Sequence, residues 1–330
     1  MPQAVLGLIR PPLLIMVSIF VAIGAVSPGQ ILPFDQTLIS GWVLMAFLVV
    51  YGTAVNDISD VEVDRINLPE SSDRPLASGL ISKRQMWFLA AISAGVAVGI
   101  GAFSSLGLLS VILAGLILPM IYSFPPFQLS HRSVGPFLLP LWYVTVPFLI
   151  GAVGHQQPIP RTTILLLAGL YVCFIGRIIL KDFRDSRGDA LYHKQTFYLQ
   201  YGRTATLLVS GLAWLTGAAI LASVNWLLGL TVGVGLPFVF YALFLLNQSN
   251  NRKTDRALIW SIARIASATM LVILMIQQTQ GEPLLYQAGL VAMIALPFAG
   301  MYFSEIRKHT SLAKSLGSAD AEPTPRSIHH

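Results

Sequence analysis

Long apolar runs constrain this chain more than any other feature of its sequence. About ten such runs, each roughly 20 residues long, follow one another along the chain. They lie at approximately 5–28, 36–57, 85–104, 106–124, 134–154, 162–180, 204–223, 226–246, 258–276 and 284–303. A helix of about 20 apolar residues crosses a bilayer, and the runs lack the alternation and short length of strands. The pattern predicts an all-α, polytopic transmembrane helical bundle.

The composition excludes a soluble protein. Hydrophobic residues make up 55% of the 330 residues and charged residues only 11%, with a mean hydropathy of +0.69. A soluble domain carries roughly 25% charged residues, which this chain lacks. The C-terminal segment is polar and contains no apolar run. We therefore expect a membrane domain over residues 1–308 and a disordered polar tail over 309–330.

The basic residues follow this topology. If the N-terminus and the loops after even-numbered runs share one side, every Lys and Arg except Arg161, Arg177 and Arg264 falls on that side. The positive-inside rule makes that side cytoplasmic. The net charge of +6 is then explained by topology and by contact with membrane lipid, and it gives no reason to expect nucleic-acid binding. We expect a multi-pass integral membrane protein of a bacterial cell membrane.

The acidic residues gather in two clusters. One follows the second apolar run, from Asp57 to Asp73, and the other follows the sixth run, from Asp182 to Asp189. Four runs separate the clusters, and an even number of crossings returns the chain to the same side. Acidic residues in a loop are usually just solvated. Two clusters at helix ends on one side of such an apolar chain favour a metal and anion site.

The spacing of the first cluster is helical. If the second run continues as a helix, Asn56, Asp60 and Asp64 share one face at i, i+4 and i+8. Oxygen ligands converging in this way suit a hard cation, and Mg²⁺ binds such oxygens together with water or phosphate.

The second cluster repeats the pattern. Asp185 and Asp189 are four residues apart, and Asp182 precedes Asp185 by three. Two such helices facing each other could hold two Mg²⁺ ions around one diphosphate. Nearby basic residues suit phosphate oxygens. They are Arg65, Arg74, Lys181, Arg184 and Arg187.

These motifs resemble the signatures of the UbiA superfamily of intramembrane prenyltransferases. Residues 56–64 match its NDxxDxxxD signature, and residues 73–79 (DRPLASG) are similar to the continuation of that motif. Residues 181–189 are similar to its second motif, KDxxDxxGD. Residues 122–126 (YSFPP) resemble a third landmark of the family. The resemblance covers roughly residues 5–280.

The resemblance implies a fold and an activity. The fold would be a bundle of about nine or ten spans around a central cavity, and the activity a Mg²⁺-dependent transfer of a prenyl group from an isoprenyl diphosphate to a hydrophobic or aromatic acceptor within the membrane. The residues implied as catalytic are Asp60, Asp64, Asp185 and Asp189. The metal ligands would be these four with Asn56 and Asp182. Contacts to substrate would come from Asn56, Asp57, Arg65, Arg74, Lys181, Arg132 and Tyr122.

Three departures from the family pattern concern the acceptor and the prenyl length. The family usually has nine spans, and about ten runs are present here. An Arg-Leu-Lys triplet often follows the third landmark, whereas residues 128–132 read QLSHR, so that Arg132 would substitute for a missing basic residue. The loop before Arg74 is also longer by Ser71 and Ser72.

Three alternatives stay open at this point. A cation-coupled transporter could use acidic motifs, although it would place them near the bilayer midplane in broken helices. A UbiA-type terpene cyclase would share both aspartate motifs and use the prenyl diphosphate as its own acceptor. A haem-farnesylating relative is disfavoured because its Met-x-Arg-Thr segment is absent after the first motif.

Overall fold

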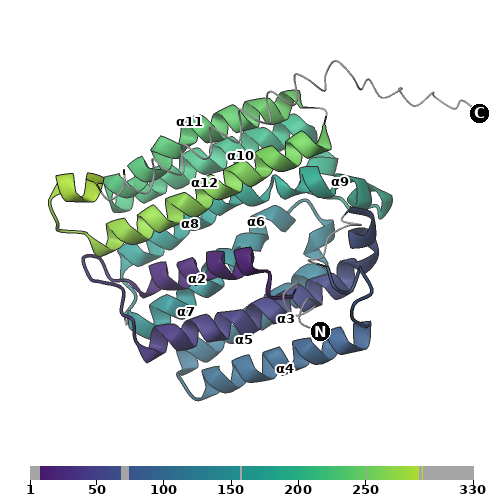
Figure 1. The fold of residues 1–330 in the computed structure, drawn as a ribbon, viewed down its shortest axis with the longest axis horizontal. Helices are drawn as coiled ribbons and strands as arrows, with labels where there is room; N and C mark the ends of the chain where they lie inside the picture. Colours follow the sequence, from purple (N-terminus) through teal and green to yellow (C-terminus); the bar gives the residue numbers. More distant parts are fainter. Residues whose placement is uncertain (1–7, 68–73, 157, 250, 290–291, 293–330) are drawn as a thin grey trace, which may run out of the picture.

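The computed structural model describes residues 8–67, 74–156, 158–249, 251–289 and 292, and every regular element among them is a helix (Figure 1). In the first half these are α2 (Pro11–Ala25), α3 (Gln36–Asn67), α4 (Lys83–Ala102), α5 (Leu106–Ser123), η1 (Leu129–His131), α6 (Gly135–Pro140), η2 (Leu141–Thr145) and α7 (Val146–His155). The second half contains α8 (Arg161–Ile178), α9 (Lys181–Leu191), α10 (Phe197–Val224), α11 (Trp226–Gln248) and α12 (Arg252–Gln278).

Among the described residues, eight helical segments are long and apolar enough to cross a membrane. They begin at Gln36, Lys83, Leu106, Gly135, Arg161, Phe197, Trp226 and Lys253. Helix α2 corresponds to the first predicted run but has only 15 residues. The tenth run, at 284–303, and the tail at 309–330 lie largely or wholly outside the described residues. The prediction of an all-α membrane bundle is confirmed.

The tight turns between α4 and α5 and between α10 and α11 have side-chain caps. Helix α5 begins after Ser105, whose hydroxyl accepts a hydrogen bond from the backbone of Leu108. Asn225 ends α10 and caps α11, since its side-chain oxygen accepts from the backbone of Leu227. These polar residues satisfy free backbone groups at helix ends, which explains why long apolar helices reverse within a few residues.

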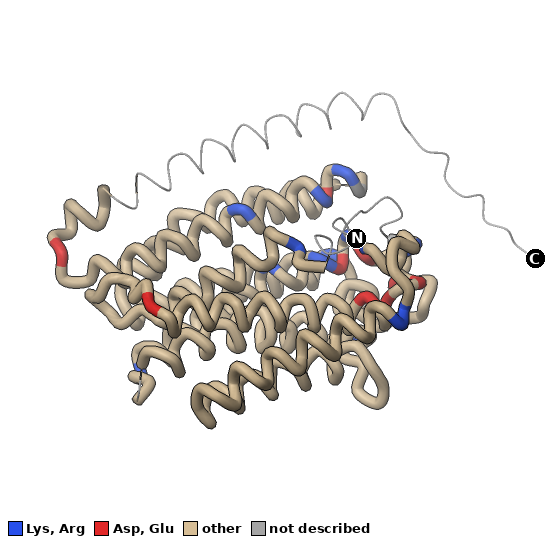
Figure 2. The backbone as a smooth tube through the Cα atoms, turned by 60° about the horizontal axis from the view of Figure 1, so that its bottom comes forward, with Lys and Arg blue, Asp and Glu red and all other residues tan. Residues whose placement is uncertain are grey.

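The two halves of the chain lie side by side. Helices α2, α3, α4, α5 and α7 form one side, and α8, α10, α11 and α12 the other (Figure 1). The ends of α3 and α9 contact each other at one end of the bundle. Most of the described charged residues gather toward this end (Figure 2). The fold therefore brings the two acidic clusters together, as the even number of intervening runs predicted.

Small residues allow the closest helix crossing. A Cβ atom on Gly24 of α2 would lie 2.0 Å from the carbonyl oxygen of Phe148 in α7, and one on Gly151 of α7 would lie 2.0 Å from that of Val21. The two backbones are thus in direct contact through reciprocal glycines. Close backbone approach of this kind is typical of membrane bundles, where packing rather than water exclusion holds helices together. It fixes the short helix α2 against the bundle that surrounds the cavity.

Candidate functional site

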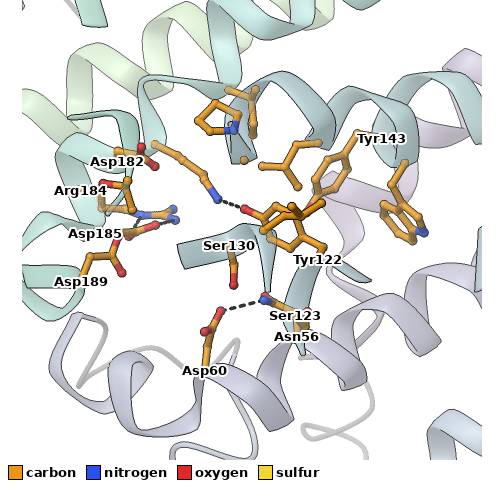
Figure 3. Close-up of a pocket in the computed structure, with 18 of the residues that line it drawn as sticks. Asn56, Asp60, Tyr122, Ser123, Ser130, Tyr143, Asp182, Arg184, Asp185 and Asp189 are labelled. Atoms are coloured by element: carbon orange, nitrogen blue, oxygen red, sulfur yellow. Dashed lines mark hydrogen bonds and ion pairs between the residues drawn. The ribbon is translucent and has the colours of Figure 1, made fainter. Parts of the chain in front are cut away.

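A cavity of about 280 Å³ lies between the two halves and is lined by both acidic motifs. Most of the site residues predicted from the sequence line it. These are Asn56, Asp60, Asp64, Arg74, Tyr122, Arg132, Lys181, Asp182, Asp185 and Asp189. Figure 3 shows Asp60 of α3 near Asp182, Asp185 and Asp189 of α9, with the two groups on different helices. Asp57 and Arg65 are the two predicted residues that do not line it.

The first motif occupies the end of α3 that extends beyond the apolar layer. A 32-residue helix is about 48 Å long at 1.5 Å per residue, whereas the hydrocarbon core is about 30 Å thick. Asn56, Asp60 and Asp64 lie along one face, as predicted, and the Asn56 amide donates to Asp60 Oδ2 at 2.8 Å. The Asp64 side chain is buried. The helical spacing thus presents three oxygen-bearing side chains to the cavity.

Asp57 has a different role from its neighbours in the motif. Its buried carboxylate binds Arg74 of the following loop and, at 2.6 Å, Arg10 just before α2. Arg74 also contacts Asp64 Oδ2 at 3.1 Å. Burial opposes the charge on Arg74, but the carboxylates of Asp57 and Asp64 raise its pKa above the ordinary value. Arg74 therefore remains charged and braces the first motif.

The second motif forms its own helix. Helix α8 ends at Ile178, and α9 begins at Lys181 with Asp182 in its first turn. The positive end of the helix dipole stabilises a negative charge at this position. Asp185 is held by the adjacent Arg184, with Nε to Oδ1 at 2.7 Å and Nη2 to Oδ2 at 2.9 Å. Asp182 and Asp189 are buried.

Lys194 joins the two motifs. Its Nζ atom lies 3.1 Å from Asp60 Oδ1 on α3 and 3.3 Å from Asp189 Oδ1 on α9. Oδ1 of Asp60 and Oδ1 of Asp189 are therefore no farther apart than the sum of these two distances. Burial opposes the charge on Lys194, but Asp60 and Asp189 raise its pKa. Burial raises the pKa of Asp189, and Lys194 opposes that shift.

Lys181 faces the cavity beside Tyr122. Its Nζ atom donates to the Tyr122 hydroxyl at 2.9 Å and lies 5.4 Å from the centre of that ring. Tyr122 belongs to the last turn of α5, so this contact connects the third sequence landmark to the second motif (Figure 3). Arg132, which the sequence suggested as a substitute for a missing basic residue, also lines the cavity.

Arg65 lies away from these residues. Its guanidinium is about half-exposed and binds Glu62 at 2.8 Å, one turn earlier on the outer face of α3. Asp73, at the start of the DRPLASG segment, lies outside the described residues. The side chain of Arg187 also lies outside the described part of the structure.

One wall of the cavity is aromatic. The span from Gly135 to His155 contains a π-helical turn, η2, and this turn supplies Trp142 and Tyr143. π-Helical turns are rare in proteins overall, but those that occur are often found at functional sites. Trp142 donates through Nε1 to the carbonyl of Gly115 at 2.9 Å, which fixes its ring. Figure 3 shows Tyr143 on the side of Tyr122 away from Asp182, Asp185 and Asp189.

The carboxylates have the donor chemistry that Mg²⁺ requires. Oδ2 of Asp182 is buried without a hydrogen-bond partner, and a buried anionic oxygen of this kind is costly unless a cation reaches it. Among the described residues, no three acidic, histidine or cysteine side chains converge closely enough to hold a metal by themselves. Mg²⁺ retains water and phosphate oxygens beside a few carboxylates, so ligands from both motifs and a diphosphate would complete its coordination.

Two of the lining cations that pair with the first motif were not predicted as parts of the site. Arg10 precedes α2 and reaches Asp57 across 47 positions of sequence, and Lys194 reaches Asp60 across 134. In the sequence both appear only as basic residues of one membrane side. The position of Lys194, five residues after Asp189, was the available signal for its proximity to the second motif.

The fold and the cavity define an integral membrane protein with paired carboxylate motifs facing each other at one end of a helical bundle. The sequence model of the UbiA prenyltransferase family matches residues 15–268. The chain belongs to this family of membrane prenyltransferases, as its motifs predicted.

Individual relatives agree with this assignment. A digeranylgeranylglyceryl phosphate synthase of Methanopyrus kandleri is 30% identical over 241 residues, which cover 73% of this chain and 84% of that protein. A probable homogentisate phytyltransferase 2 of rice is 30% identical over 176 residues, which cover 49% of this chain and 44% of that protein. The structure of a UbiA homologue from Archaeoglobus fulgidus, bound to DMAPP and Mg²⁺, superimposes with a TM-score of 0.62 at 16% identity, covering 84% of this chain and 99% of that one.

Proposed function

We propose that this protein transfers a prenyl group from an isoprenyl diphosphate to an acceptor within the membrane, in a reaction that requires Mg²⁺. The observation that carries the proposal is the opposition of two carboxylate motifs across one cavity, with Asp60 and Asp189 sharing Lys194. The proposed metal ligands are Asn56, Asp60, Asp64, Asp182, Asp185 and Asp189. The solved structure of the Archaeoglobus homologue with DMAPP and Mg²⁺ supports the same use of the fold.

The proposed reaction breaks one bond and forms one. The bond between the allylic carbon and the diphosphate oxygen breaks, and its electron pair leaves with the diphosphate. The acceptor atom then donates an electron pair to the allylic carbon and loses a proton. Bound Mg²⁺ would stabilise the negative charge that develops on the leaving group.

The basic residues of the site have a complementary task. Lys194 and Arg184 neutralise Asp60, Asp185 and Asp189 in the structure. When cations and a diphosphate occupy the cavity, these same side chains are near enough to bind phosphate oxygens, together with Lys181. The aromatic wall keeps water from the allylic cation, and the faces of Tyr122 and Tyr143 favour positive charge.

Two acceptor classes fit the relatives. The sequence motifs suggest an aromatic ring, and the rice relative is named for homogentisate. The Methanopyrus relative is named for a glyceryl phosphate product, for which the nucleophile would be an alcohol. An acceptor of either class enters the cavity beside the allylic carbon, and we propose one of these two as the second substrate.

We also propose that the site faces the cytoplasm. The support is the concentration of Lys and Arg in the loops at the end of the bundle that carries both acidic motifs (Figure 2).

Product analysis tests the proposal. The purified protein is incubated with geranyl, farnesyl or geranylgeranyl diphosphate and Mg²⁺, with and without an aromatic or glyceryl phosphate acceptor. We expect slow diphosphate release from the donor alone and faster release with the correct acceptor, accompanied by a prenylated product. A cyclic hydrocarbon or alcohol formed efficiently without any acceptor would instead identify a terpene cyclase with the same metal site. Absence of diphosphate release with every donor would contradict both enzymatic functions and leave the transporter alternative.

A further inference from the structure

Arg177 is a cation inside a membrane span that faces the cavity without a carboxylate beside it. It lies on α8, within the span Arg161–Ser186, and lines the same cavity as the aspartates. Its Nη1 atom lies 3.5 Å from the sulfur of Met16, and its guanidinium carbon lies 5.2 Å above the ring of Phe174. A thioether is a weak acceptor, and a ring face accepts no strong hydrogen bond. Most of the five N–H donors of Arg177 therefore have no strong acceptor among these contacts.

Arg132 and Arg256 also line the cavity but are exposed, whereas the less exposed cations beside Arg177 have polar partners. Arg10 and Arg74 bind Asp57, Lys194 binds Asp60 and Asp189, and Lys181 binds the Tyr122 hydroxyl. Among the described residues, Arg177 forms no ion pair with a carboxylate. A charged side chain at this depth is costly unless an opposite charge reaches it, so a ligand is the natural partner.

The surroundings of Arg177 separate it from the metal motifs. Phe174, over which the guanidinium lies, stacks on Tyr143 with ring centres 5.7 Å apart. Figure 3 shows Tyr143 on the far side of Tyr122 from the aspartates of α9. Arg177 also belongs to α8, whereas Asp185 and Asp189 belong to α9, after the break between the two helices. The guanidinium therefore lies at the aromatic wall of the cavity, and the carboxylates of the second motif lie on a separate helix.

We propose that Arg177 binds the anionic group of the acceptor and so selects acceptors that carry a phosphate or a carboxylate. This inference rests on the proposed prenyl transfer. With the donor diphosphate at the aspartates and the acceptor anion at Arg177, the nucleophile and the allylic carbon meet between the two, beside Tyr122. The planar guanidinium can form two parallel hydrogen bonds with either anion.

Both proposed acceptor classes carry a negative charge that Arg177 could bind. A glyceryl phosphate and homogentisate differ in their nucleophile, an alcohol in the first and an aromatic ring in the second. Each nevertheless carries one anionic group away from its reacting atom. A single arginine at the aromatic end of the cavity accounts for recognition of either one.

The test compares Arg177→Gln and Arg177→Lys with Arg161→Gln, which removes an exposed arginine at the start of the same helix. The donor is geranylgeranyl diphosphate. The acceptors are geranylgeranylglyceryl phosphate, its uncharged analogue geranylgeranylglycerol, and homogentisate. The measurements are acceptor KM, equilibrium binding of the donor, and slow diphosphate release without acceptor.

We expect Arg177→Gln to raise the KM of the accepted anion about 10- to 100-fold, because charge-assisted hydrogen bonds contribute about 1.5–3 kcal/mol. Donor binding and basal diphosphate release stay unchanged, Arg177→Lys recovers part of the loss, and Arg161→Gln behaves as the natural protein. Which anion shows the effect distinguishes phosphate from carboxylate.

Three results would overturn the inference: an unchanged acceptor KM in Arg177→Gln, an equal loss of donor binding, or a natural protein that prefers geranylgeranylglycerol or accepts neither anion. Failure of the proposed function is a different result, because the natural protein would then release no diphosphate from any donor.

Discussion

At the scale of single residues, the carboxylates of the site are held by basic side chains. Asp57 is shared by Arg10 and Arg74, Asp185 pairs with Arg184, and Lys194 links Asp60 to Asp189. Buried charges require such partners. The arrangement keeps several negative charges close together, and Lys194 and Arg184 would be available to phosphate if Mg²⁺ bound these carboxylates.

The positions of residues 56, 60, 64, 182, 185 and 189 along one cavity could be predicted because their spacing is local and helical. Arg10 and Lys194 could not, because their contacts depend on how distant helices meet. The sequence also could not separate Asp57 from its neighbours in the motif. Only the packing of α2 and of the loop at Arg74 against α3 turns Asp57 toward two arginines and away from the cavity.

The proposed roles of Asp60 and Asp185 predict large effects on catalysis. We expect Asp60→Ala or Asp185→Ala to reduce turnover by a factor of about 100 or more, since each loses charge stabilisation of the leaving group. Steady-state assays of diphosphate release measure this. Glu62→Gln is the matched control, because Glu62 lies on the same helix as Asp60 but is exposed and pairs with Arg65. Near-normal turnover in either alanine variant would remove that residue from the site.

At the scale of helices, the bundle depends on a few close crossings. The turn chemistry at Ser105 and Asn225 and the apolar runs themselves were readable from the sequence. The break between α8 and α9 and the π-helical turn η2 were not, because each reflects local geometry imposed by tertiary packing. That geometry matters for the site, since α9 carries the second motif and η2 supplies Trp142 and Tyr143.

The close crossing of α2 and α7 predicts that an alanine in place of its glycine destabilises the protein, whereas the same substitution at an open position does not. Gly151→Ala puts a Cβ atom 2.0 Å from the carbonyl oxygen of Val21, whereas Gly95 of α4 has open space around its Cβ position. We expect Gly151→Ala to lower the melting temperature by several degrees, because overpacking costs about 1–3 kcal/mol. Gly95→Ala should leave it unchanged or raise it slightly, because alanine favours helices.

The single cysteine provides the measurement. Cys173 is buried in α8, so a thiol-reactive dye labels it only as the bundle opens. Equal melting temperatures for Gly151→Ala and the natural protein would show that the two backbones are not in contact there.

At the scale of the whole molecule, the site is a product of topology. Two halves of the chain each contribute one acidic motif, and the even number of spans between the motifs brings both to the same end of the bundle (Figure 1). Hydropathy was enough to predict this parity. It could not predict that α2 would be only 15 residues long, because hydropathy does not show where a helix begins and ends within an apolar run. The identity of the acceptor also could not be predicted from the sequence, since it depends on which side chains surround the cavity.

The dependence of diphosphate release on Mg²⁺ tests the central claim most directly. The purified protein is treated with a chelator, supplied with geranylgeranyl diphosphate and its acceptor, and assayed as Mg²⁺ is added back. We predict no diphosphate release after chelation and full recovery with Mg²⁺, because the carboxylates of α3 and α9 can stabilise the leaving group only through a cation that both motifs bind. Diphosphate release that continues unchanged in the chelated protein would contradict a metal-dependent site between the two motifs.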